Sequence, residues 1–109
     1  MKVNTVTTRR NANNRNRGKV YERRVATTLG GVRNLDKSRP HTDVETEDSV
    51  YEVKSTQASV PMWLDNAYKQ LENASKESNK TMGGVVKVFT KNKARAFLIQ
   101  EIELKGETL

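Results

Sequence analysis

The chain contains no cysteine, which excludes disulfide bonds and metal sites built from thiolates. No apolar run approaches the ~20 residues that a membrane-spanning helix requires. The basic residues near the start are not followed by the apolar stretch of a secretory signal. These features predict a cytoplasmic protein without a membrane span. The length of 109 residues corresponds to one domain with a modest core.

Acidic residues are almost missing from the first 24 positions, where Glu22 is the only one. Eight basic residues lie in the same segment, so its excess of seven positive charges equals the formal net charge of +7 for the chain. Such a segment attracts polyanions and displaces counterions from a nucleic-acid backbone, although it can also be a merely solubilising tail. The residues expected to contact DNA from this segment are Arg9, Arg10, Arg15, Arg17, Lys19 and Arg23.

The apolar pattern separates a basic arm from a folded domain. Residues 1–17 alternate Asn and Arg without apolar periodicity, which predicts a flexible arm that is disordered without its partner. Residues 18–109 form the expected domain. A helix is predicted from about Lys19 to Leu29, because Val25, Ala26 and Leu29 fall on one stripe and two glycines follow.

The remaining pattern predicts an α/β fold with a mixed central β-sheet flanked by helices. The expected strands cover residues 32–35, 43–46, 50–55, 85–90 and 96–104, with a helix from about Pro61 to Ser78 and a polar loop over 36–42. The 50–55 strand, the helix and the 85–90 strand can form a right-handed crossover. That topology would place the 50–55 strand in the middle of the sheet.

This strand carries the most informative side chains. Alternation places Glu52 and Lys54 on one side of the strand, and Asp43 precedes Glu52 by nine residues. Magnesium prefers carboxylate oxygens, and a bound divalent ion activates water against a phosphodiester. We therefore predict that Asp43 and Glu52 bind Mg²⁺, with the backbone carbonyl of Val53 as a further ligand. Lys54 would offset negative charge developing at the scissile phosphate.

Glu22 is a second candidate for the same site. It lies beside the apolar stripe of the first helix, where a buried charge is costly unless it is paired or binds a metal. The alternative is an edge residue that pairs with Arg23 or Arg24 or is simply solvated.

Asp43, Glu52 and Lys54 match the spaced Asp and Glu-x-Lys signature of the restriction-endonuclease-like PD-(D/E)xK nuclease superfamily. Over most of residues 18–104 the chain resembles the archaeal-type and phage-encoded Holliday junction resolvases. The resemblance covers the opening helix with Glu22, the first strand with Arg33, and the Tyr51–Ser55 segment. It implies a homodimer that cuts four-way DNA junctions symmetrically with Mg²⁺ or Mn²⁺, in DNA recombination and repair. A compact chain of this type would suit a phage, which implies the host cytoplasm.

The resemblance also assigns further residues. Gln70 matches a glutamine often found after the Glu-x-Lys strand and is expected in the catalytic site, and Ser38 lies in a loop resembling the mobile loop of this family. Ser38 and Arg39 are expected to contact the DNA backbone from this loop, and Arg33 is a further expected DNA contact.

The chain departs from the family in one place, since Thr42 rather than proline precedes Asp43. Asp36 or Glu45 therefore stays open as a substitute for Asp43. A small branch of virus-type replication-repair nucleases shares the same core, so a nuclease for flaps or nicked duplexes is an alternative. A non-catalytic nucleic-acid-binding protein, with Asp43, Glu52 and Lys54 only a salt-linked hairpin, is the alternative from another class.

Overall fold

The computed structural model describes the backbone of residues 5–106, and the side chains from residue 15 to residue 106. The chain divides into two compact units. The first unit contains the residues up to Gln57 together with the segment from Glu103, and the second unit spans Ala58–Ile102. Sequence length alone predicts one domain, whereas each of these units has its own helix and its own sheet.

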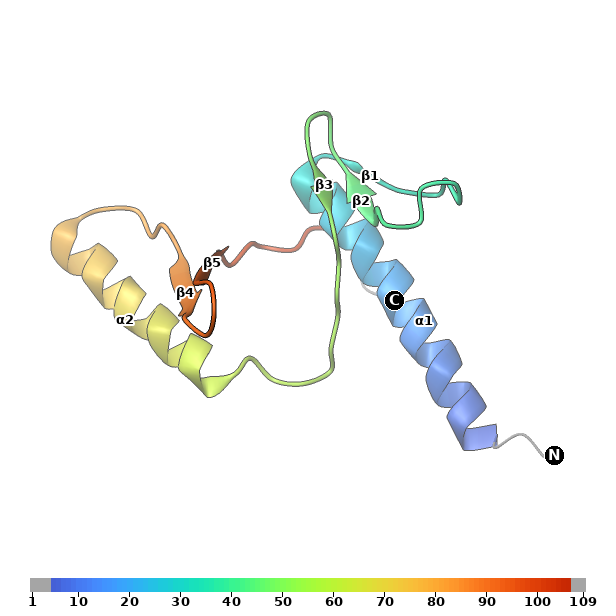
Figure 1. The fold of residues 1–109 in the computed structure, drawn as a ribbon, viewed down its shortest axis with the longest axis horizontal. Helices are drawn as coiled ribbons and strands as arrows, with labels where there is room; N and C mark the ends of the chain where they lie inside the picture. The colour runs from blue at the N-terminus through green and yellow to red at the C-terminus, as the bar shows by residue number, and fades with distance from the viewer. Residues whose placement is uncertain (1–4, 107–109) are drawn as a thin grey trace. The chain divides into compact units, whose positions relative to one another are not determined.

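The first unit is built on helix α1, Thr5–Leu29 (Figure 1). The helix ends as predicted, because Gly30 adopts a left-handed φ of 71° and the Gly31 amide donates to the Ala26 carbonyl at 2.9 Å. Its beginning differs, since the helix extends back to Thr5 through a segment where the sequence predicts no regular structure. Residues 1–4 lie outside the described part of the chain.

Three short strands complete the first unit: β1, Val32–Arg33; β2, Val44–Glu45; and β3, Val50–Tyr51. They form an antiparallel sheet with β2 in the centre. Helix α1 contacts β1 and β2, and Val44 on β2 is fully buried. Later in the chain, the Lys105 amide donates to Thr28 Oγ1 of α1 at 2.8 Å. The small core of this unit therefore lies between α1 and the central strand.

The second unit pairs helix α2, Met62–Ser78, with a hairpin of β4, Val85–Phe89, and β5, Arg95–Ile99. Pro61 precedes the helix as predicted, and Asn79 ends it in a left-handed conformation. Helix α2 contacts β4. The Tyr68 hydroxyl donates to the Ile99 carbonyl at 2.9 Å and accepts from the Glu101 amide at 2.6 Å. This residue ties the helix to the chain at the end of β5.

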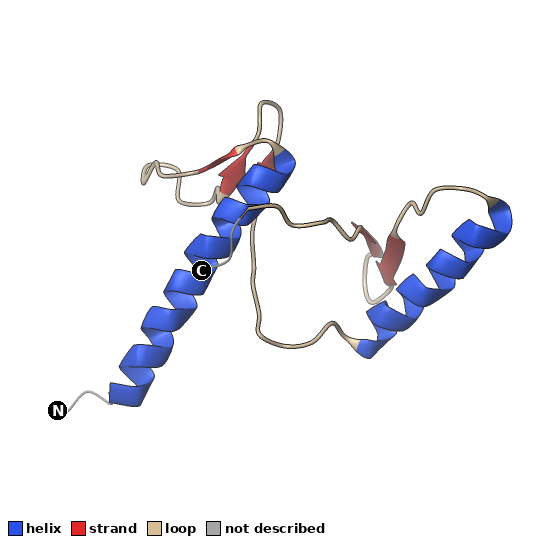
Figure 2. Ribbon diagram, turned by 180° about the vertical axis from the view of Figure 1, so that it is seen from behind, coloured by secondary structure: helices blue, strands red, loops and turns tan. Residues whose placement is uncertain are grey.

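The mixed α/β composition and the predicted order of elements are confirmed, but the sheet arrangement differs. The described strands form two antiparallel sheets instead of one mixed sheet, and β3 and β4 belong to different sheets. The 50–55 strand ends at Tyr51, since the Val53 amide donates to the Asp43 side chain rather than to a backbone carbonyl. Residues 52–61 then form an irregular connection to α2 (Figure 2).

Neither α1 nor α2, the two helices of the described range, combines the length and apolar character needed to cross a bilayer.

Gly31→Ala is expected to destabilise the first unit by about 1–3 kcal/mol, the usual cost of overpacking. A Cβ atom at this position would collide with the Glu45 carbonyl of β2 and lie 2.9 Å from a methyl group of Thr46. Gly18→Ala is the matched control, because an added Cβ there meets nothing within 4 Å and alanine favours a helix by up to about 1 kcal/mol. Thermal unfolding should move in opposite directions for the two variants, and equal shifts would contradict this packing.

Candidate active site

Asp43 is held firmly at the entrance to β2. Its amide donates to the Tyr51 carbonyl at 3.2 Å, and its carbonyl accepts from the Asn34 amide at 2.9 Å. Its carboxylate, which is partly buried, accepts from the Val53 amide at 2.8 Å. These bonds fix the carboxylate beside the segment that follows β3. Asp43 and Val53, two residues of the predicted metal site, are therefore in direct contact.

Glu52 and Lys54 flank Val53 and meet each other. The Lys54 Nζ atom lies 3.1 Å from Glu52 Oε1, and both side chains are exposed. They therefore share one side of the chain, as alternation predicts, although the strand itself has already ended. The Asp43 bond to Val53 brings this pair close to Asp43 along the backbone.

Glu22 projects from α1 and is neutralised by Arg33 of β1. The Arg33 Nε atom donates to Glu22 Oε2 at 2.7 Å, and each side chain is 23% exposed. The pairing explains how a carboxylate is accommodated beside the apolar stripe of the helix. The sequence offers Arg23 or Arg24 as the local partner, but the partner is a residue of the sheet. Arg33, expected to contact DNA, has one donor engaged in this ion pair.

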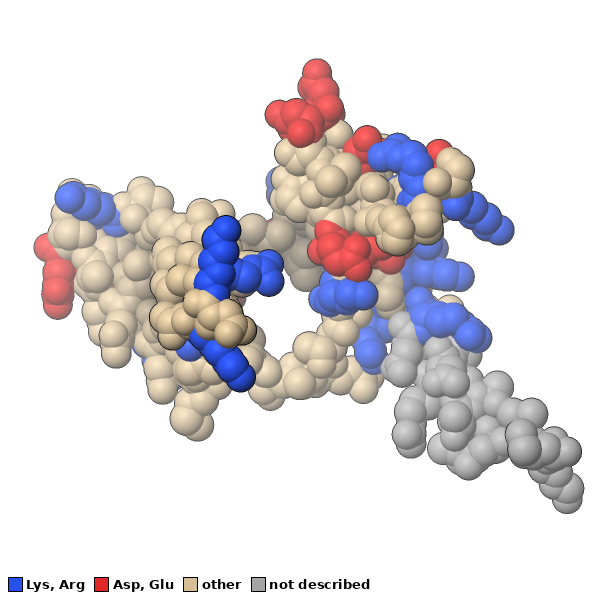
Figure 3. Space-filling model, viewed as in Figure 1, with Lys and Arg blue, Asp and Glu red and all other residues tan. Residues whose placement is uncertain are grey.

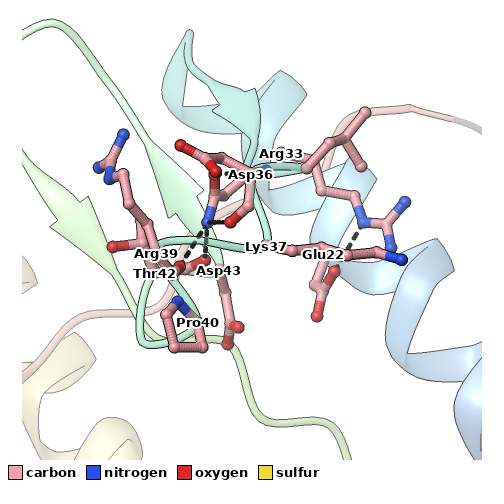
Figure 4. A pocket seen from close by; sticks show the side chains of 10 residues that line it. Glu22, Arg33, Asp36, Lys37, Arg39, Pro40, Thr42 and Asp43 are labelled. Carbon is pink, nitrogen blue, oxygen red and sulfur yellow. Dashed lines mark hydrogen bonds and ion pairs between the residues drawn. The ribbon is translucent and has the colours of Figure 1, made fainter.

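A cavity of about 420 Å³ joins two of the predicted acids. Glu22 and Arg33 line one part of it, and Asp43 and the loop over residues 34–42 line the remainder (Figure 4). The loop contributes the cations Lys37 and Arg39. Glu52 and Lys54 are not among the lining residues. The cavity therefore combines carboxylates with basic side chains, a composition suited to a phosphate or a solvated cation.

Asn34 organises the loop that walls this cavity. Its side-chain amide donates to the carbonyls of Arg39 and Thr42, each at 2.8 Å, and its side-chain oxygen accepts from the Asp36 amide at 3.1 Å. Sequence reasoning missed this residue. The available signal is an Asn at the start of a polar loop, because an Asn side chain commonly accepts from the backbone amide two residues later in an Asx turn.

The hydrogen bonds and ion pairs of Asp36, Asp43 and Glu45 differ, and these are the three acids considered as the first metal ligand. Asp36 Oδ1 accepts from both the amide and the hydroxyl of Ser38, and Glu45 pairs with Arg39 at 2.8 Å. Asp43 alone of the three bonds to the segment carrying Glu52 and Lys54, among the contacts of the described residues. The geometry therefore favours Asp43, the residue that the sequence places first.

Hydrogen bonds from Ser38, first from its hydroxyl and then from its amide, lower the pKa of Asp36 from its ordinary value of 3.8. A lowered folded-state pKa contributes stability that is complete above the unfolded-state value and is lost as pH falls through the folded-state value. Ser38→Ala is expected to raise the pKa of Asp36, because the hydroxyl donor is removed. Carboxyl NMR titration of both proteins measures the change, and an unchanged or lower Asp36 pKa in the variant would contradict the assignment.

The donors near Asp43 match a hard divalent cation in kind. Mg²⁺ usually takes one or two carboxylates and retains water, and Asp43 with Glu52 supplies that number. Within the described part of the chain, no group of three or more Asp, Glu or His side chains converges closely enough to hold a metal ion. Glu22 is instead paired with Arg33, and Glu52 with Lys54.

The other predicted residues are distributed over both units. Arg15, Lys19 and Arg23 are exposed on α1, and the Nε atom of Arg17 is buried without a hydrogen-bond partner among the described residues. The side chains of Arg9 and Arg10 lie outside the described part. Gln70 is exposed on α2, in the second unit, and its catalytic role stays a prediction.

Comparisons of the chain with protein-family models, with curated proteins and with solved structures found no match.

Proposed function

We propose that the chain is a metal-dependent DNA endonuclease, with four-way junctions as its substrate and a homodimer as its working form. The observation that supports this proposal is the 2.8 Å bond from the Val53 amide to the Asp43 carboxylate. It joins the isolated acid of the predicted signature to the residue between Glu52 and Lys54, and these two side chains pair at 3.1 Å. We further propose a cytoplasmic location, in the host cell if the chain is phage-encoded.

The proposed roles follow from the side-chain chemistry. Asp43 and Glu52 would hold Mg²⁺ or Mn²⁺, and the ion would supply an activated water and neutralise phosphate charge. The carbonyl of Val53 is the proposed additional ligand. Lys54, an exposed side chain with a flexible four-carbon stem, would place its ammonium group against the reacting phosphate.

Glu22 would assist from α1, with Gln70 as a further proposed catalytic residue. In the present geometry the Glu22 carboxylate accepts from Arg33, so it would have to exchange that partner to take part. A DNA phosphate is a suitable competitor, because arginine binds phosphate and carboxylate with the same fork of donors.

The finer fold proposal is a restriction-endonuclease-like core. The supporting feature is the order of elements, since helix α2 separates the strand that begins at Val50 from the strand that begins at Val85.

The dimer proposal is supported by the free edge of β5 and by the charged residues that flank this strand. Among the described strands, β5 pairs with β4 alone, which leaves its other edge free for a second copy. An antiparallel self-pairing centred on Phe97 would set Lys93 opposite Glu101 of the second copy. The free edge of β4, centred on Lys87, would instead oppose two lysines, which is unfavourable.

Charge exchange tests this interface. Glu101→Lys is expected to shift the protein toward monomer in sedimentation equilibrium, because two lysines would then face each other across each end of the paired strands. Combining it with Lys93→Glu should restore the dimer. A dimer that is unaffected by Glu101→Lys, or that the double variant does not restore, would place the interface elsewhere.

A second candidate function is non-catalytic binding of nucleic acid. The ion pairs Glu22–Arg33 and Glu52–Lys54 favour it, since each of these acids is already neutralised by a cation of the same chain. In that case the acids would stabilise the fold locally and bind no metal.

Cleavage of a panel of labelled DNA substrates tests the proposal. The panel contains a four-way junction with matched duplex, nicked, flap and single-stranded DNA, each incubated with Mg²⁺, Mn²⁺ or EDTA. Paired symmetric cuts in the junction that require metal and Glu52 are expected. Cuts in flaps or nicked duplexes would support the same active site but assign it a different substrate. Binding without any cutting would establish the second candidate function.

A further inference from the structure

The hairpin of β4 and β5 forms the most one-sided charged surface of the second unit. From Val85 to Ile99 it contains Lys87, Lys91, Lys93 and Arg95 and no acidic residue. Figure 3 shows the basic side chains gathered at this end of the unit. A cluster of cations without compensating acids attracts polyanions and predicts salt-dependent binding.

Aromatic rings lie among these cations and are open to solvent. Phe89 and Phe97 are 53% and 46% exposed, and their centroids lie 5.8 Å apart in an edge-to-face arrangement. Trp63 of α2 is 44% exposed. Large rings in a small unit would gain more by burial than by exposure, so three accessible rings beside a basic strand pair indicate a binding surface.

The strand register places the rings and the cations on one face. Lys87 stands opposite Phe97, and Phe89 stands opposite Arg95. Directly opposed residues, and residues two apart along a strand, share a face of the sheet. All four side chains therefore project from the same side of the hairpin.

Cation–ring contacts connect this face to α2. The Lys87 Nζ atom lies 4.5 Å from the centroid of Trp63 and 6.0 Å from that of Phe89, and the Arg95 guanidinium lies 5.0 Å from the centroid of Phe97. The five side chains Trp63, Lys87, Phe89, Arg95 and Phe97 are named here the aromatic-basic face. Both cations of this face therefore lie within 6.0 Å of a ring centroid.

We propose that the aromatic-basic face binds single-stranded nucleic acid, with unpaired bases stacked on its rings and phosphates held by its cations. Every base has a flat face that can stack on an aromatic ring, whereas a duplex keeps those faces inside its own stack. An acidic peptide would use the cations but gives no reason for three accessible rings. This inference rests on the proposed function and deepens it, because it assigns unpaired nucleotides to the proposed DNA substrate. Binding to the face is measured without cleavage, so the binding proposal and the endonuclease proposal can fail independently.

Binding of a twelve-nucleotide oligo(dT) to the full-length chain in EDTA tests the proposal. A strand of equal length with abasic sugars carries the same phosphates and no bases, so the contribution of the basic α1 segment is common to both. Oligo(dT) is expected to bind about five- to a hundredfold more tightly than the abasic strand, which is the gain in affinity expected from stacking one base on an aromatic ring. Trp63 is the only tryptophan, and its fluorescence should be quenched by oligo(dT) and not by the abasic strand.

Substitutions on the face separate stacking from charge. Phe89→Leu and Phe97→Leu, singly and together, keep apolar volume and should reduce the preference for oligo(dT), most in the double variant. Leu98→Ala on the opposite face is the control and should retain the preference. Arg95→Gln should reduce the slope of log affinity against log salt by about 0.7, the value for one single-strand phosphate contact, whereas Lys76→Gln on α2 should not.

Equal affinity for oligo(dT) and the abasic strand would overturn the proposal, as would leucine variants that keep the full preference. Tighter binding of polyglutamate or of anionic lipid vesicles than of oligo(dT) would identify a surface for another polyanion and would also overturn it. If the proposal holds while no DNA substrate is cut, the binding face stands and the endonuclease does not.

Discussion

Asp43→Asn is expected to slow metal-dependent junction cleavage by at least about a hundredfold, while folding and DNA binding remain those of the wild type. The asparagine oxygen can still accept the Val53 amide, so the bond that joins the entrance of β2 to the Glu52 segment is retained. Only the negative charge is lost. A carboxylate that holds a catalytic ion contributes several kcal/mol to the transition state, and each 1.36 kcal/mol corresponds to about tenfold in rate.

Controls distinguish the loss of charge from the loss of structure. Asp43→Ala removes the acceptor as well, and leaving the Val53 amide without a partner should cost a further ~1–3 kcal/mol of stability. Asp36→Asn and Glu45→Gln change the two competing acids, which are engaged with Ser38 and Arg39. Both should cut at nearly the wild-type rate. If Asp36→Asn abolishes cleavage and Asp43→Asn does not, Asp36 holds the position assigned to Asp43.

Lys54→Gln is expected to reduce cleavage by about a hundredfold with almost no change in stability. The Lys54 side chain is 85% exposed and its ion pair with Glu52 is solvated, so the pair contributes at most ~1 kcal/mol to folding. A cation at the developing phosphate charge acts mainly in the transition state, where one lost donor typically costs about 10²–10³ in rate. Single-turnover cleavage and thermal unfolding together measure the two effects.

Lys76→Gln provides a matched control for Lys54. Lys76 is 72% exposed and pairs with Glu72 at 3.3 Å on α2, so the same charge is removed from a similar environment. Cleavage should be unchanged in this variant. Equal loss in both variants would show that total positive charge, rather than the ammonium group at position 54, determines the rate.

Local patterns predicted much of the fold. The end of α1, the bounds of α2 and the approximate positions of β4 and β5 follow from apolar periodicity, proline and glycine, all of which act within a few residues. The start of α1 was missed because its Asn- and Arg-rich segment has no apolar stripe, and periodicity detects a helix only through the face it buries. The strands were predicted too long, since their ends depend on which acceptor each amide finds. At Val53 that acceptor is a side chain ten residues earlier.

In the candidate site, too, local contacts could be predicted from the sequence and contacts between distant residues could not. Side-chain alternation in an extended chain correctly predicts that Glu52 and Lys54 meet. The partner of Glu22 could not be predicted, because Arg33 reaches it only after α1 and the first sheet have packed together. Asn34 was missed for a related reason, since its three carbonyl acceptors are brought together only when the 36–42 loop closes.

Single-turnover cleavage of a labelled four-way junction by wild type and Asp43→Asn, in Mg²⁺ and in EDTA, is the decisive measurement. Both proteins should bind the junction with similar affinity. The wild type should make paired cuts in Mg²⁺ and none in EDTA, and Asp43→Asn should be at least about a hundredfold slower in Mg²⁺. Equal cutting by the two proteins, or junction binding by the wild type without cleavage in Mg²⁺, would contradict the assignment of Asp43 and its neighbours as a nuclease site.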